Sequence, residues 1–171
     1  MRSAPALLTG LLLLFSLFLP AAGNGQDKPA VFLSIHPKEV KLKIGREVTI
    51  RVEVHGAKDL FGAPFYLLYN PKALEVLKVN EGAFLKQDGK NTTFLHKVDK
   101  EKGWIVIGLT RLGDIGGVSG KGTLVTMTFR ALWPGRAIFS FEKVDFRDSR
   151  LNVLTVQLSA ARVEILRTTA K

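Results

Sequence analysis

In "FYLLYNPKALEVLKV" (residues 65–79), two apolar runs flank the tetrapeptide Tyr-Asn-Pro-Lys. Pro71 fixes its own φ, supplies no N–H to a β-ladder and disfavours the helical region for Asn70. An Asn-Pro pair also favours the start of a turn. The sequence therefore predicts that one strand ends near Tyr69 and that another begins near Ala73.

Outward from this corner, apolar and polar residues alternate with a period of two. In "EVTIRVEVHG" (residues 47–56), the valines and Ile50 share one face and the polar residues share the other, as in a half-buried strand. Glycine and proline turn signals separate similar segments, and no stretch has a helical period of useful length. We expect strands near 31–36, 39–44, 47–55, 62–69, 73–79, 91–98, 104–111, 122–132, 136–144 and 161–166, the first two being either separate or one broken strand. This spacing predicts an all-β fold, a jelly-roll β-sandwich of about nine strands.

The first 23 residues have the layout of a secretory signal peptide. Arg2 precedes an apolar run over residues 7–19, and small residues follow Pro20. A permanent membrane anchor would need about 20 apolar residues, and this run is shorter. We therefore expect a signal peptide over 1–23, a linker over 24–29, one domain over 30–167 and a tail over 168–171. The mature protein is predicted to be secreted or periplasmic, with no stable membrane span.

The composition limits the classes of function. The chain has no Cys, which excludes disulfides, thiol catalysis and Cys-ligated zinc. Its net charge of +10 favours acidic partners or anionic surfaces. The basic residues are scattered, however, whereas a nucleic-acid site would gather them on one face or stripe. We expect no nucleic-acid partner.

Short motifs of catalysis and metal binding do not occur in recognisable form. The glycine-rich "GDIGGVSGKG" (residues 113–122) lacks the spacing and the following helix of a phosphate-binding loop, and Ser119 lacks the spacing of a nucleophile elbow. His36, His55 and His96 are far apart in sequence and form no short ligand pair. Two carboxylates on distant strands could form a glycosidase pair, but no pair stands out. The sequence thus predicts a non-enzyme with no metal and no cofactor.

The corner is one of several sequence segments whose order and spacing resemble those of a known domain family. An aromatic-rich strand ends in Tyr-Asn-Pro and leads into "ALEVLKVNEGAFL". The other segments are "EVTIRVEVHG", "GWIVIGLT", "GKGTLVTMTFRAL" and "GRAIFSFEKVDFRD", followed by a final Val-Glu-Ile strand. Over about residues 30–166 the chain resembles the cohesin domain family, the jelly-roll modules that bind dockerin modules in cellulosomes and related bacterial assemblies. The family usually has Tyr-Asp-Pro where this chain has Tyr-Asn-Pro.

The resemblance implies a docking face. In the family, dockerin lies against one sheet face, built here by the segments 62–69, 91–98, 104–111 and 136–144. Carried over by alternation, the outward residues are Tyr66, Leu68, Leu95, Lys97, Trp104, Val106, Ser140 and Glu142. Phe65, Leu67 and Tyr69 would then point into the core, to which the corner returns Leu74 and Val76. An error of one residue in register would instead turn Tyr66 and Trp104 inward.

The same positions also mark a departure from the family. Gly62, Pro64 and Arg111 stand where dockerin-binding members present polar and acidic side chains. The resemblance implies an exported, non-catalytic module that binds a protein partner, either dockerin-like or an envelope protein.

One alternative remains open at this point. Carbohydrate-binding modules of similar jelly-roll fold stack exposed aromatic rings on sugars, and Tyr66, Trp104, Trp133 and Phe61 are the candidates here. The chain would then be a polysaccharide-binding module linked to polysaccharide catabolism.

Overall fold

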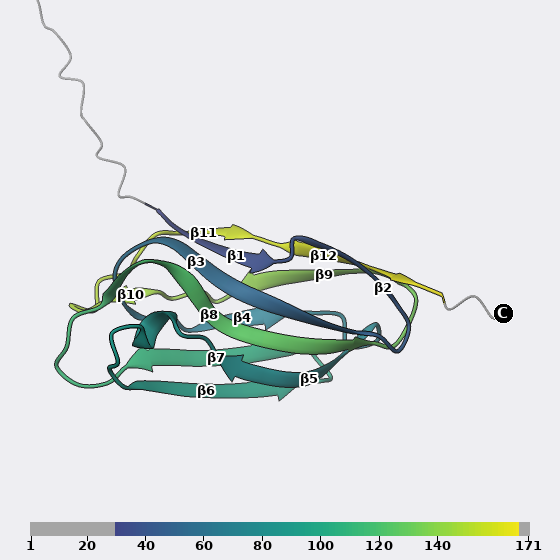
Figure 1. Cartoon of the computed structure of the whole chain (residues 1–171), viewed down its shortest axis with the longest axis horizontal. Coiled ribbons are helices and arrows are strands. Elements are labelled where there is room, and N and C mark those ends of the chain that lie inside the picture. The colour runs from purple at the N-terminus through teal and green to yellow at the C-terminus, as the bar shows by residue number, and fades with distance from the viewer. Residues whose placement is uncertain (1–29, 168–171) are drawn as a thin grey trace, which may run out of the picture.

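The computed structural model describes residues 30–167, whose regular secondary structure is almost entirely β-strand (Figure 1). The strands are β1 (Val31–His36), β2 (Glu39–Lys43), β3 (Glu47–Gly62), β4 (Phe65–Leu68), β5 (Leu74–Glu81), β6 (Thr92–Asp99), β7 (Trp104–Arg111), β8 (Val118–Ala131), β9 (Gly135–Glu142), β10 (Arg147–Asp148), β11 (Val156–Ser159) and β12 (Ala161–Leu166). A single 3-10 turn, η1 (Phe84–Lys86), is the helical element of this range, and nothing in the range is a helix long and apolar enough to cross a membrane. The expected signal peptide (1–23), linker (24–29) and tail (168–171) lie outside the described residues.

The strands form one mixed sheet that curls into two layers. One layer has the order β5-β8-β3-β1-β11, and the other has the order β6-β7-β4-β9-β12-β2. The layers are joined where Gly62, at the end of β3, pairs with Thr110 of β7. Their inward side chains meet in one core, in which the ring of Phe129 from β8 lies 4.7 Å from that of Phe139 from β9. The predicted all-β jelly-roll sandwich is confirmed.

Strand lengths differ from the prediction where glycines were taken as strand ends. β3 continues past Gly56 to Gly62, and its pairing with β8 shifts register three times, so the two long strands can bend without ending. β8 also begins at Val118 rather than at residue 122. The short strands β10 and β11 were not predicted.

The first two segments are separate strands in different layers. β1 pairs antiparallel with β3, whereas β2 pairs parallel with β12. The chain crosses between the layers at Pro37 and Lys38, and it is Pro37 that interrupts the first segment, since it cannot donate to a ladder.

The Tyr-Asn-Pro corner is held by a compact set of hydrogen bonds. The side-chain oxygen of Asn70 accepts from the backbone N–H of Lys72 at 3.0 Å, and its carbonyl accepts from the N–H of Leu74 at 3.0 Å. The N–H of Tyr69 donates to the carbonyl of Gly103 at 2.9 Å. Gly103 has φ +69°, and a Cβ there would lie 2.3 Å from the carbonyl oxygen of Tyr69, so this approach requires glycine.

Burial confirms the predicted faces on both sides of the corner. Phe65, Leu67 and Tyr69 are buried, whereas Tyr66 and Leu68 are half-buried on the outer side. Past the corner, Leu74 returns to the core and Val76 packs partly buried against it.

Alanine substitutions on the inward and outward faces should therefore differ in their effect on stability. Leu74 is only 1% exposed, so Leu74→Ala should lower the free energy of unfolding by about 2 to 5 kcal/mol through lost burial and the cavity left behind. Tyr66→Ala should cost much less, because its ring lies on the outer side. Chemical denaturation of both variants measures the difference, and a larger loss for Tyr66→Ala would contradict the assignment of faces.

A carboxylate ties the far end of β3 to two loops. Asp59 adopts φ +55°, and its carboxylate accepts hydrogen bonds from the hydroxyl of Ser149 at 2.6 Å and the backbone N–H of Gly117 at 2.6 Å. The hydrogen bond from the Ser149 hydroxyl, together with those from the backbone N–H groups of Gly117 and Ser149, holds the pKa of Asp59 below its ordinary value of 3.8. A Cβ on Gly117 would lie 2.2 Å from the Asp59 backbone, so the loop can approach this closely only with glycine.

The lowered pKa of Asp59 predicts a dependence of stability on pH. Because the carboxylate is favoured in the folded state, its contribution is complete above the ordinary pKa of 3.8 and is lost as the pH falls from that value through the lower pKa of the folded state. Asp59→Asn should thus be less stable than wild type near neutral pH, and the gap should narrow in acid. Urea denaturation over a pH series measures this. A gap that stays constant into acid would contradict the role of the charge, and Asp114→Asn, at an exposed loop position, serves as the control.

Candidate functional site

The structure brings all the predicted outward residues together on one face. β4 lies between β7 and β9, and β6 flanks β7. The cross-strand partners are Tyr66 with Val106 and Glu142, Leu68 with Trp104 and Ser140, Lys97 with Val106, and Leu95 with Gly108. Paired residues in a ladder point to the same side of the sheet. We call the outer side of β6, β7, β4 and β9 the β7 face.

An aromatic and lysine cluster lies on the β7 face. The rings of Tyr66 and Trp104 are 5.8 Å apart and inclined at 57°. The ammonium of Lys143 lies 4.7 Å from the centre of the Tyr66 ring and 5.5 Å from that of Trp104, and Lys102 lies 5.1 Å from the Trp104 ring. Both rings are half-buried on the outer side, so they are not turned inward. Lysine over an aromatic face is a favourable cation–π arrangement, which gives this cluster a positive rim.

The other end of the β7 face is an apolar hollow. Gly108 has no side chain, and the surrounding hollow is lined by Leu95, Phe61, Pro64 and Leu151 among others. Leu95 is 68% exposed. Leu95 was predicted from the sequence, but Leu151 was not, because Leu151 comes from the turn after β10 and its position beside β7 depends on tertiary packing.

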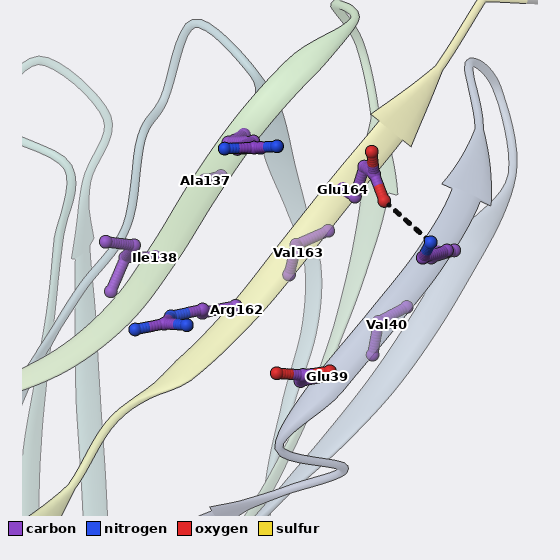
Figure 2. A pocket seen from close by; sticks show the side chains of 9 residues that line it. Glu39, Val40, Ala137, Ile138, Arg162, Val163 and Glu164 are labelled. Carbon is purple, nitrogen blue, oxygen red and sulfur yellow. Dashed lines mark ion pairs between the residues drawn. The ribbon is translucent and has the colours of Figure 1, made fainter.

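The same sheet continues into a charged groove over β9, β12 and β2, which Figure 2 shows from close by. Arg162 lies opposite Glu39 and Ile138 in the ladders, and Glu164 forms an ion pair of 3.1 Å with Lys41, drawn as a dashed line. Ile138 has the same alternation as Ser140 and Glu142, so the groove and the β7 face lie on one side of the sheet. This groove was not predicted, because its basic residues are dispersed along the sequence and meet only through strand pairing.

Arg111, at one of the departures from the family pattern, does not belong to the β7 face. Its side chain turns inward, is almost fully buried, and donates to the two carboxylate oxygens of Asp88 at 2.6 and 3.1 Å and to the carbonyl of Leu85. The guanidinium holds the pKa of the Asp88 carboxyl below its ordinary value. Arg111 therefore anchors the segment around η1 against β7.

The aromatic candidates for sugar stacking do not form a flat platform. Of the four sugar-stacking candidates, Tyr66 and Trp104 are the two whose rings pair with each other within residues 30–167, and these rings are tilted. Lysine ammoniums lie over both rings. Trp133, 69% exposed, stands at the turn between β8 and β9, where its backbone N–H donates to the carbonyl of Ala73, and it belongs to neither β4 nor β7. Coplanar stacking on a sugar chain is thus not favoured here.

Two of the three histidines meet in the fold, contrary to their separation in sequence. The rings of His36 and His55 are 6.4 Å apart, and the Glu53 carboxylate lies between them. The hydrogen bond from Arg51 is the main cause that lowers the pKa of Glu53. His96 lies elsewhere, on β6. Alternation places Glu53 and His55 on the outer face of β3, but the pairing of β1 with β3 that brings His36 beside them cannot be read from the sequence.

Comparison with known proteins adds a family match. The model of a family described as "Cohesin domain" matches residues 33–165. No match was found among curated proteins.

Solved structures share the fold along most of the chain. A non-cellulosomal cohesin from the hyperthermophilic archaeon Archaeoglobus fulgidus is 20% identical with a TM-score of 0.67, covering 80% of this chain and 91% of that one. The type I cohesin–dockerin complex Coh-OlpC-Doc435 from Clostridium thermocellum contains a chain that is 21% identical with a TM-score of 0.69, covering 82% of this chain and 96% of that one. A type II cohesin domain from the cellulosome of Acetivibrio cellulolyticus is 16% identical with a TM-score of 0.69, covering 79% of this chain and 95% of that one.

Proposed function

The chain belongs to the cohesin domain family, and we propose that it is a non-catalytic module that binds a dockerin or dockerin-like protein through the β7 face. The observation that carries the proposal is the cluster of Tyr66, Trp104 and Lys143 on that face. Aromatic side chains dominate the energetic centres of protein interfaces, and these two are held in place by their neighbours.

The chemistry of the face points to the character of the partner. Leu68, Val106 and Leu95 supply apolar contact area, whereas Lys97 and Lys102 add positive charge around it. A complementary surface would place an apolar centre inside a rim of acidic side chains. The complex from Clostridium thermocellum, in which a cohesin is bound to a dockerin, supports the choice of partner. Because this similarity carries the fold alone, the residues in contact are part of our proposal.

We test the face with one substitution at each end and one control for each. Leu95→Glu places a charge in the apolar hollow, and Trp104→Ala removes the aromatic anchor. Each should weaken binding by about 2 kcal/mol or more, roughly 30-fold, as for an interface hot spot. Calorimetric titration with the dockerin modules of the same organism measures the affinities.

The controls carry the same chemical changes elsewhere. Leu158→Glu alters β11 in the opposite layer, where Leu158 is 49% exposed, and Trp133→Ala removes the other tryptophan. Both should bind like wild type. Wild-type affinity in Leu95→Glu and Trp104→Ala would place the docking site elsewhere. If the partner is an envelope protein captured from the source cell, the same two substitutions should weaken its binding and the same two controls should not.

Polysaccharide binding makes a different prediction. Affinity electrophoresis through soluble glucans, with a binding assay on insoluble ones, should show no retardation of the domain. Retardation that is lost in Trp104→Ala or Trp133→Ala would replace our proposal with a carbohydrate-binding module.

Export is the second part of the proposal, and it rests on the layout of residues 1–23. If the signal peptide is removed after Gly23, the mature protein begins at Asn24. N-terminal sequencing of protein recovered from the periplasm or the medium should read Asn-Gly-Gln-Asp. A chain that keeps Met1 and sediments with membranes would show a retained anchor instead.

A further inference from the structure

The histidine and glutamate cluster lies in the layer opposite the β7 face. β1 and β3 run side by side (Figure 1). They pair antiparallel, with Ser34 opposite Glu53, Phe32 opposite His55 and His36 opposite Arg51. Glu53 and His55 are two residues apart on β3 and therefore share a face. His36 reaches Glu53 diagonally from β1. Three donor side chains thus converge from two neighbouring, well-paired strands.

The donor atoms are close enough to share one ion. Nε2 of His36 lies 3.8 Å from Oε2 of Glu53, and Nε2 of His55 lies 3.7 Å from the same oxygen. All three donor atoms lie within 4.8 Å of one another. In a tetrahedral zinc site with bonds of about 2.0 to 2.2 Å, neighbouring ligand atoms are roughly 3.3 to 3.6 Å apart. The two contacts with Glu53 almost meet this geometry, and the histidine side chains, 32% and 43% exposed, have room to close the remaining gap.

The two oxygens of Glu53 have different surroundings. Nε of Arg51 donates to Oε1 at 2.8 Å, which leaves Oε2 facing both imidazoles. Such a hydrogen bond from outside the ligand set orients a ligating carboxylate. The positive charge of Arg51 also lowers the affinity of the cluster for any cation that is bound by electrostatic attraction alone.

We propose that His36, Glu53 and His55 form a binding site for Zn²⁺ with an open fourth position. Two imidazoles and one carboxylate are a ligand set typical of zinc sites that keep one position open. Ca²⁺ prefers six to eight oxygen ligands, whereas this cluster offers one carboxylate that is already shared with Arg51. The site uses β1 and β3 and is independent of the proposed docking function.

The fourth position opens into a hollow beside the ligands. Ser34, Phe32, Gln157 and Ser159 contribute to its lining. Oγ of Ser34 lies 3.1 Å from Nε2 of His36. When the metal takes that nitrogen, the Ser34 hydroxyl becomes available to a water molecule bound at the fourth position.

Calorimetric titration of the domain with ZnCl₂ tests the site, with CaCl₂ as the comparison. We expect one Zn²⁺ per chain, no comparable Ca²⁺ binding, and a melting temperature that rises with zinc. Loss of an outer-shell partner typically costs 10- to 100-fold in metal affinity, so His55→Ala and Glu53→Gln, which remove ligands, should each weaken zinc binding by about 100-fold or more. His96→Ala removes the third histidine and should leave the affinity unchanged.

Folding and coordination are checked separately. Melting temperatures in EDTA establish that the variants are folded, which we expect because the substituted side chains are only half-buried. X-ray absorption of the zinc-loaded protein should show scattering from two imidazoles. Absence of a zinc titration in wild type would overturn the proposal. Equal zinc affinity in wild type, His55→Ala and Glu53→Gln would also overturn it, because the ion would then bind elsewhere.

Discussion

The short strand β4 pairs with β7 on one side and with β9 on the other, and the register of these two ladders sets both the core and the outer surface. Through these two ladders Phe65 and Leu67 enter the core, and Tyr66 and Leu68 face outward. A shift of one residue would exchange the two sets. The apolar inner row makes such a shift costly, because it would expose buried rings and bury a tyrosine hydroxyl. The same register that stabilises the core therefore assembles the outer cluster.

The two layers carry surfaces of different chemistry. The β7 face combines aromatic rings, exposed leucines and lysines, a composition suited to a protein partner of opposite charge. The layer of β1 and β3 presents imidazoles and a carboxylate instead. Between them lies a shared apolar core that contains the contact of Phe129 with Phe139. Because the surfaces are on opposite layers, a partner on one leaves the other open.

Much of the fold could be predicted because a strand leaves a period of two in its own sequence. The faces of β4 and β7, and the turn at Asn70, follow from alternation and from the chemistry of proline. Strand ends were harder, since Gly56 resembles a turn signal while the ladder runs through it. The edge strands β10 and β11 are too short to leave a period. The binding role proposed for the β7 face rests on the family resemblance, because alternation alone does not show which of two outer faces would meet a partner.

The fold class, the inward and outward rows of each central strand and the corner at Pro71 can be read from the sequence. These are local properties, each set by a few consecutive residues. Other contacts are visible only in the folded chain: Lys143 lies over Tyr66, Leu151 borders the hollow at Gly108, Arg111 turns inward to Asp88 and His36 meets His55. Each of these contacts joins residues whose separation along the chain says nothing about their distance in space. Strand order and cross-strand register bring them together, and both are set by the packing of the whole core.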